Sequence, residues 1–275
     1  MPLGKLSPAR QNGCMSVPNE LPHSQGIPAA TVVIFRNGPD DGPPEILMTV
    51  RSRNMVFAGG MAVFPGGKVD PADFTLAETW EHGLAADEAA HQIAVVRETL
   101  EETGLAIGLA GELTASTAAA ARTRLLELGE LAPVLQEFGW ALDLAQLTPF
   151  ARWFPKNERI PRVYDTRFYL ANLGTGAVDI AIDHSENTHL FWTSARGALE
   201  MAARGEIKLI FPTRRNLERL ALFGSFAEAK AQAEAIPVRT ISPFMGEKDG
   251  KGWLEIGEQH GYPVTGEPLD QVMRG

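Results

Sequence analysis

The chain has little cysteine and no long apolar run. Its single cysteine, Cys14, excludes an intrachain disulfide framework. No apolar stretch approaches the ~18–20 residues that are needed to cross a bilayer, so we expect no membrane partner. The N-terminus lacks the basic segment followed by an apolar segment that is typical of a secretory signal, and the last residues, VMRG, are not a peroxisomal address. These absences predict a protein of the reducing cytoplasm.

Basic residues are also in the minority. The chain has 25 Lys and Arg residues against 34 Asp and Glu residues, which gives a formal net charge of −9. Non-specific binding to nucleic acid depends on many contacts between basic side chains and phosphates, so we expect no nucleic-acid partner. A small phosphorylated ligand is compatible with this balance, because it needs only a local basic pocket and a metal ion.

The length of 275 residues and the hydrophobic content of 44% are ordinary for a soluble globular protein. We expect a flexible N-terminal leader over residues 1–28 and a single domain over residues 29–275. The domain has expected insertions at residues 74–92 and 110–140 and a C-terminal helical extension at residues 194–275.

Local patterns predict the elements of this domain. Apolar β-branched runs predict strands, Ala-rich runs predict helices, and Gly- and Pro-rich runs predict turns. Ser194 is the expected N-cap of a helix. The expected strands are 30–36 and 45–50, paired as a hairpin, then 60–64, 147–154, 166–171 and 189–192, and a hairpin of 238–242 with 253–256. The expected helices are 118–128, 134–138, 195–203, 213–223 and 226–235.

A further helix is predicted to end at Gly104, a residue suited to the left-handed position after a last turn. Ile93, Val96 and Leu100 recur at helical spacing and would face a core. Asp87 is the expected N-cap, so most of the preceding insertion is expected to be a loop.

Three carboxylates share one turn of this helix, because Glu98, Glu101 and Glu102 stand at positions i, i+3 and i+4. One interpretation is a solvated acidic face. The other is a site for a hard divalent cation, since carboxylates are preferred ligands of Mg²⁺ and Mn²⁺. Arg97 can reach Glu101 at i+4, and residues 65–67 (PGG) predict a tight turn whose bare backbone can approach a metal or phosphate.

These residues resemble the box of the Nudix hydrolases, G-x5-E-x7-R-E-U-x-E-E-x-G-U, in which U is a bulky aliphatic residue. Asp73 replaces the first Glu of the box and Thr99 replaces the aliphatic residue after Arg-Glu. Between Asp73 and Arg97 lie 23 residues instead of the usual seven. The matching positions are Gly67, Arg97, Glu98, Glu101, Glu102, Gly104 and Leu105.

The resemblance implies an α+β fold, a Nudix α/β/α sandwich with a mixed β-sheet. It also implies a metal-dependent hydrolase of nucleoside diphosphates linked to another group. By similarity, Mg²⁺ or Mn²⁺ would be bound by Glu98, Glu101, Glu102 and the backbone carbonyl of Gly67. Arg97 would orient the carboxylates. The general base stays open between a box glutamate such as Glu101 and the more distant Glu186.

A second motif lies upstream of the box. Nudix members that cleave coenzyme A carry L-L-T-x-R-[SA]-x3-R-x3-G-x3-F-P-G-G, and residues 47–67 match nine of its eleven positions. Met48 and Val56 are the departures. With the interrupted box and the C-terminal helices, this motif resembles the long branch that includes peroxisomal-type coenzyme A diphosphatases.

The resemblance therefore implies hydrolysis of coenzyme A or acyl-coenzyme A to 3′,5′-ADP and 4′-phosphopantetheine or its acyl form. Two alternatives are another substrate, such as ADP-ribose or a dinucleotide, and a Nudix-fold binding module without catalysis. A homodimer is a possible assembly. The candidate contacts to the substrate phosphates are Arg51, Arg53 and Lys68, with Arg159 and Arg162 as weaker candidates.

Overall fold

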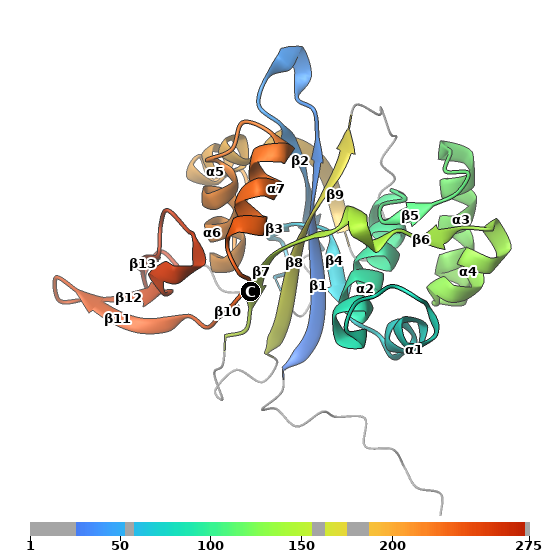
Figure 1. Ribbon diagram of the computed structural model, residues 1–275. Coiled ribbons are helices and arrows are strands. Elements are labelled where there is room, and N and C mark those ends of the chain that lie inside the picture. The colour runs from blue at the N-terminus through green and yellow to red at the C-terminus, as the bar shows by residue number, and fades with distance from the viewer. Residues whose placement is uncertain (1–25, 53–57, 156–162, 175–186, 273–275) are drawn as a thin grey trace, which may run out of the picture.

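The structure is a computed structural model, and it describes residues 26–52, 58–155, 163–174 and 187–272. Helices cover both faces of a central sheet (Figure 1). The described helices are α1 (Pro71–Thr79), α2 (Ala86–Thr103), α3 (Ala115–Leu128), α4 (Leu131–Phe138), α5 (Ala195–Ala203), α6 (Phe211–Leu220) and α7 (Phe226–Ala235), with the short 3-10 helices η1 (Pro39–Asp41), η2 (Leu144–Gln146) and η3 (Glu258–His260).

The described strands form three sheets. The central sheet has the order β10-β7-β8-β1-β2-β3, with β4 paired to β1 and β9 paired to β2. The strands are β1 (Ile27–Arg36), β2 (Glu45–Arg51), β3 (Ala62–Val63), β4 (Gly66–Lys68), β5 (Leu109–Ala110), β6 (Ala141–Leu142), β7 (Thr148–Trp153), β8 (Tyr164–Gly174), β9 (Asn187–Ser194), β10 (Thr240–Ile241), β11 (Phe244–Lys248), β12 (Lys251–Glu255) and β13 (Gly266–Pro268).

The central sheet is mixed, as expected. β1 is parallel to β8 and antiparallel to both β2 and β4. The predicted hairpin of the first two strands is confirmed by the register Phe35 to Ile46. β1 pairs with β8 from Ile27 to Arg36, and it also pairs with β2 and β4. It is therefore a central strand of the sheet.

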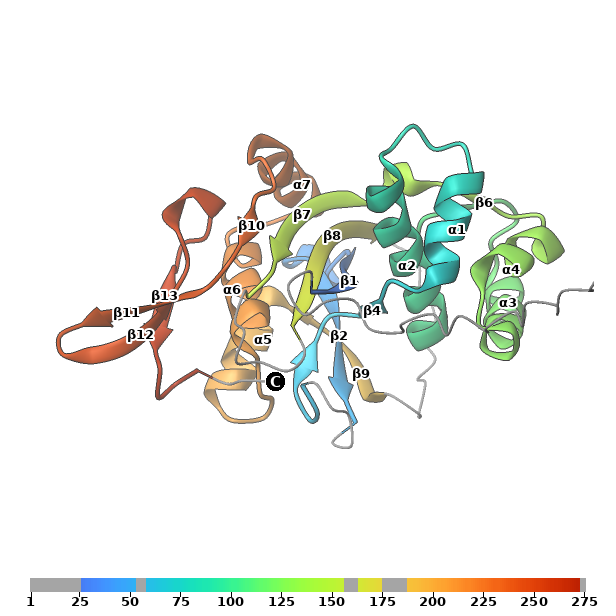
Figure 2. The same ribbon diagram turned by 90° about the horizontal axis from the view of Figure 1, so that it is seen from below.

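Alternation along β1 divides its side chains between two cores, since successive side chains of a strand point to opposite faces. Ala30, Val32 and Ile34 belong to the core that α2 covers, whereas Val33 and Phe35 belong to the core under α6 and α7. Figures 1 and 2 show α1 to α4 on one side of the sheet and α5 to α7 on the other. The predicted α/β/α sandwich is confirmed.

Two predictions near strand ends are wrong. Residues 65–67 are not a tight turn: Gly66 begins the short strand β4, which pairs with β1. Gly66 has φ 147°, and a Cβ there would lie 2.3 Å from the Ala30 carbonyl oxygen, so only glycine permits this close pairing. At the C-terminus, β12 pairs with β11 and β13, while β10 pairs with β7 instead of closing the predicted hairpin.

The insertion within the box is also more ordered than predicted, because the helix α1 (Pro71–Thr79) runs into it. Pro71 is at the start of α1, and Asp70 and Asp73 form a reciprocal capping box. Asp87 is not the N-cap of α2, since the helix begins at Ala86 and the Asp87 carboxylate pairs with Arg167 of β8 instead.

Among the helices of the described part of the chain, none combines the length and the apolar character that a bilayer span requires.

Candidate active site

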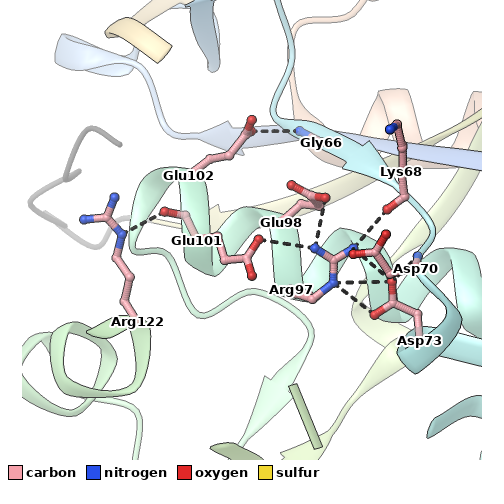
Figure 3. Close-up of polar contacts among 9 residues, drawn as sticks. All are labelled: Gly66, Lys68, Asp70, Asp73, Arg97, Glu98, Glu101, Glu102 and Arg122. Carbon is pink, nitrogen blue, oxygen red and sulfur yellow. Dashed lines mark hydrogen bonds and ion pairs between the residues drawn. The ribbon is translucent and has the colours of Figure 1, made fainter. Parts of the chain in front are cut away.

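The acidic turn of α2 packs against the β4 strand (Figure 3). The Gly66 backbone N–H donates to Glu102 Oε2 over 3.0 Å. Glu98 lies so close to Gly67 that a Cβ at that residue would be 2.2 Å from Glu98 Oε1. Two of the three carboxylates therefore lie directly at the Gly66–Gly67 backbone, which is where the sequence pattern predicted them.

Arg97 is the hub of this cluster, and its side chain is only 4% exposed. Its Nε and Nη2 atoms donate to the two carboxylate oxygens of Asp73 at 2.9 to 3.3 Å. Its Nη1 atom donates to Glu98 at 3.0 Å and to Glu101 at 3.2 Å, which confirms the predicted i,i+4 pair. Nη2 also donates to the Lys68 carbonyl at 2.9 Å. One guanidinium therefore ties α1, β4 and the acidic turn together.

Asp73 is the partner whose role the sequence reasoning missed. It is 1% exposed, and it serves both in the capping box of α1 and as the bidentate partner of Arg97. Asp70 lies 3.5 Å from the same guanidinium. A sequence signal for this role exists, because Asp73 stands at the first acidic position of the box that also contains Arg97.

Arg122 of α3 was also missed. Its Nε atom donates to the backbone carbonyl of Glu101 over 2.8 Å. This carbonyl lies in the last turn of α2, where helix carbonyls lack intrahelical partners, so Arg122 satisfies one of them. No local pattern in the sequence indicates this contact, because it joins two separate helices, from Arg122 of α3 to Glu101 of α2.

The electrostatics of the cluster leave one carboxylate poorly compensated. Burial and the charge of Glu98 raise the pKa of Glu101 to about 7, although Arg97 acts in the opposite direction. Burial disfavours the charged form of Arg97, but its hydrogen bonds to Asp73 and the charges of Glu98, Asp73 and Glu101 outweigh this effect and raise the pKa of Arg97. The cluster therefore has one cation for several carboxylates.

The ligand types at this site suit a divalent cation, but the side chains do not converge on one point. Hard carboxylate oxygens and the Gly67 backbone suit Mg²⁺ or Mn²⁺, and the unmet acidic excess at Glu101 is what such an ion would neutralise. Within the described residues, however, no three acidic, His or Cys side chains already form a group that could hold an ion. Glu98 and Glu101 are turned to Arg97 and Glu102 to Gly66, so their side chains have to rotate to meet one ion.

Two of the predicted contacts to the substrate phosphates, Arg51 and Lys68, lie on strands of the central sheet. Arg51 ends β2 and is half-buried, and the Lys68 side chain is exposed at the end of β4. In Figure 3, Lys68 meets Arg97 through its backbone carbonyl. The remaining candidates lie outside the described residues: Arg53, Arg159, Arg162 and Glu186.

Comparison with known families decides how this cluster is to be understood. The model of the NUDIX domain family matches residues 27–207, a span that contains β4, α1, α2 and the whole carboxylate cluster. The chain belongs to the Nudix family. It is a Nudix hydrolase, and members of this family act on small nucleoside diphosphate substrates and generally use divalent metal ions.

Two relatives of this Nudix hydrolase are informative. The acyl-coenzyme A diphosphatase NUDT19 of Gallus gallus is 28% identical over 258 residues, which covers 72% of this chain and 68% of that protein. A crystal structure of a NUDIX hydrolase from Alicyclobacillus acidocaldarius is 27% identical, with a TM-score of 0.63, and covers 76% of this chain and 96% of that one.

Gly67 gives a first test of the site in this Nudix hydrolase. In Gly67→Ala the new methyl group displaces the Glu98 carboxylate, which is the flexible end of a side chain, so the fold is expected to persist. We expect hydrolysis to fall by about tenfold or more, because a small displacement within an active site is costly and Glu98 is a candidate site residue. Steady-state kinetics and thermal melting measure the two effects. Gly224→Ala is the control, since the nearest atom to its added Cβ is 3.6 Å away. Equal losses of activity in both variants would contradict a specific role for the Gly67–Glu98 approach.

Proposed function

We propose that this chain is a metal-dependent Nudix diphosphatase that hydrolyses the phosphoanhydride of coenzyme A or acyl-coenzyme A. The products are 3′,5′-ADP and 4′-phosphopantetheine or its acyl form. The carboxylate cluster against Gly66 and Gly67 supports the hydrolysis of a diphosphate. The motif at residues 47–67 and the similarity to an acyl-coenzyme A diphosphatase support the substrate.

In this proposal Glu98, Glu101, Glu102 and the Gly67 carbonyl hold Mg²⁺ or Mn²⁺. A bound divalent ion supplies charge neutralisation at the phosphoryl oxygens and lowers the pKa of a bound water. Arg97 acts as a positioning residue, because its hydrogen bonds go to carboxylates and to the Lys68 carbonyl.

The proton of the attacking water passes to a carboxylate. Glu101 is one candidate, because it is a half-buried carboxylate of the acidic turn beside Arg97. Glu186 is the other candidate, and Glu186→Gln, compared with Glu101→Gln at saturating metal, separates the two roles. Arg51, Arg53 and Lys68 are the proposed contacts to the phosphates of the substrate.

A panel of diphosphates tests the substrate. We expect purified protein with Mg²⁺ or Mn²⁺ to cleave coenzyme A and acyl-coenzyme A with a higher kcat/KM than ADP-ribose or a dinucleotide. Separation of the products by chromatography should give 3′,5′-ADP. Preferential cleavage of ADP-ribose with inert coenzyme A would overturn the substrate, and leave the hydrolase assignment standing.

Metal binding is expected to depend on pH. A proton and a metal ion compete for the same carboxylate, so metal affinity falls as the ligand becomes protonated. Because the pKa of Glu101 is raised to about 7, we expect the affinity for Mn²⁺ to be constant above pH 8 and to fall on acidification below pH 7. Calorimetric titration between pH 5.5 and 8.5 measures this. Constant affinity down to pH 5.5 would show that Glu101 does not hold the ion.

A further inference from the structure

The C-terminal sheet has an open edge at β11. This sheet has the order β11-β12-β13, so within the described residues β11 pairs with β12 alone. Figures 1 and 2 both show the β11–β12 hairpin extending away from the helices and the central sheet. An open edge presents unpaired backbone N–H and C=O groups, and another strand can pair with them.

The pairing of β12 shows which residues of β11 face the open edge. The Gly252 carbonyl and the Ile256 N–H make backbone hydrogen bonds of 3.0 and 2.7 Å on the β13 side. Because the direction of the bonds alternates along an antiparallel strand, the residues between them bond to β11, where their partners are Phe244, Gly246 and Lys248. The N–H and C=O groups of Met245 and Glu247 therefore point to the open edge.

The same edge carries exposed apolar side chains. Phe244 is 52% exposed and Met245 is 62% exposed. Proteins usually protect an edge strand from pairing with charged residues, proline or a bulge. In β11 the charged residues are Glu247 and Lys248, next to the turn, and Lys248 is paired with Glu255 of its own hairpin at 2.6 Å. Within the described part of the chain, the other half of this edge is apolar and uncovered.

The sequence of β11 favours one way of pairing two copies. In an antiparallel pair with two-fold symmetry, the outward residues Met245 and Glu247 have to bond to outward residues of the second copy. An axis through Met245 would place Glu247 opposite Pro243, which has no N–H. An axis through Glu247 would place like charges opposite each other, which is destabilising. An axis through Gly246 places Met245 opposite Glu247 in both directions and avoids both conflicts.

We propose that β11 is the interface of a homodimer, in which two copies pair their β11 strands antiparallel about a two-fold axis at Gly246. Met245 of each copy exchanges backbone hydrogen bonds with Glu247 of the other, so the two C-terminal sheets become one continuous sheet. Phe244 of each copy lies opposite Lys248 of the other, whose ammonium lies 4.7 Å from the centre of the Trp253 ring. The proposal is independent of the proposed hydrolysis, since β11 contains none of the proposed metal ligands or substrate contacts.

Sedimentation velocity of the full chain tests the assembly. One chain has a mass of 29.8 kDa, so a dimer has a mass of about 60 kDa. Because strand pairing of this kind buries a small area, we expect a dimer at about 100 μM that dissociates on dilution. Met245→Pro removes an outward N–H and keeps the bonds between β11 and β12, so it should be a monomer with the circular dichroism spectrum of the parent. A parent that is monomeric at about 100 μM, or a Met245→Pro variant that is dimeric, would overturn the proposal.

Charge substitutions at Met245 test the register, because Glu247 of the second copy lies opposite. Met245→Glu places like charges opposite each other, and Met245→Lys places opposite charges there. We expect the dissociation constant of the Met245→Glu dimer to be about tenfold or more above that of Met245→Lys, since the contact occurs twice. Leu222→Glu is the control, because it adds the same charge at an apolar residue that is 59% exposed outside the hairpin, and it should dimerise as the parent does. Equal dissociation constants for Met245→Glu and Met245→Lys would contradict pairing about Gly246.

Disulfide cross-linking measures the position of the axis, in a Cys14→Ser background that removes the native cysteine. Facing residues at the axis have Cα atoms about 4.5 Å apart, a distance that a disulfide can bridge. After oxidation, Gly246→Cys should run as a covalent dimer on a denaturing gel without reductant. The nearest atoms to the added side chain belong to the flexible end of Glu255, which can move.

Lys248→Cys is the control for this cross-link. The two copies of this residue would lie roughly 14 Å apart along the paired strands, so the variant should run as a single chain. Equal cross-linking of Gly246→Cys and Lys248→Cys, with or without a covalent dimer, would overturn the proposal.

Discussion

Glu101→Gln is expected to lower turnover by about three orders of magnitude without a loss of thermal stability. The substitution removes a proposed metal ligand and keeps the size of the side chain. Charge stabilisation by a bound metal contributes several kcal/mol to a transition state, which corresponds to a factor of about 10³ or more. Single-turnover and steady-state kinetics with a diphosphate substrate measure the loss.

The stability of the same variant follows from the pKa of Glu101. Burial and the charge of Glu98 raise this pKa from 4.5 to about 7, so in the absence of metal the folded state disfavours the charged carboxylate. The stability associated with the protonated form is complete below pH 4.5 and is lost as the pH rises through 7. At pH 8 without metal, the neutral Gln should therefore melt at the same temperature as the parent or slightly higher.

Glu234→Gln on the exposed face of α7 is the matched control for the kinetic effect. It should leave both turnover and melting temperature unchanged. Equal turnover in the parent, Glu101→Gln and Glu234→Gln would end the assignment of Glu101 to the reaction.

Arg97→Met is expected to have the largest effect on stability. It leaves the Asp73 carboxylate, 1% exposed, without its guanidinium partner at 2.9 Å. Breaking a buried pair by removing one partner costs about 3–5 kcal/mol. For a chain of this size, a loss of this order lowers the melting temperature by roughly 10 °C. Activity should fall as well, because Glu98 and Glu101 lose their shared donor.

The double variant Asp73→Asn with Arg97→Met separates stability from function. It removes the stranded buried charge, so part of the stability should return while the activity stays low. Arg124→Met is the control: Arg124 pairs with Glu127 and Glu137 on the surface, and exposed pairs contribute little. Similar melting temperatures for Arg97→Met and Arg124→Met would contradict the role of Arg97 as the hub of the cluster.

The parts of the fold that the sequence predicts well are those set by local pattern. The spacing of Ile93, Val96 and Leu100 and the stop at Gly104 predict the end of α2, and all are found there, with Gly104 at φ 76°. The two apolar strands and the Gly- and Pro-rich residues 37–44 between them predict their hairpin. The placement of Glu98 and Glu102 beside the glycine pair follows from the box itself.

What the sequence does not predict depends on contacts between distant segments. Gly66 is part of a strand because β4 pairs with β1, which lies far away in the sequence. The residues of β4 themselves are as typical of a turn as of a strand. β11 is short and contains Gly246, so its local preference for a strand is weak. It forms a strand because it pairs with β12. The helix α1 is different: Pro71 between Asp70 and Asp73 is a local start signal that the sequence analysis did not use, although it indicates a helix that runs into the insertion.

Diffraction from crystals grown with Mn²⁺ tests the central claim most directly. We predict an anomalous peak that lies about 2.2 Å from carboxylate oxygens of Glu98, Glu101 and Glu102 and from the Gly67 carbonyl oxygen. The side chains of Glu98 and Glu101 should have rotated to reach it while each keeps a hydrogen bond from Arg97 Nη1 through its other carboxylate oxygen. A protein that hydrolyses a diphosphate in the same Mn²⁺ buffer, but whose crystals place the ion away from these residues, would contradict the account.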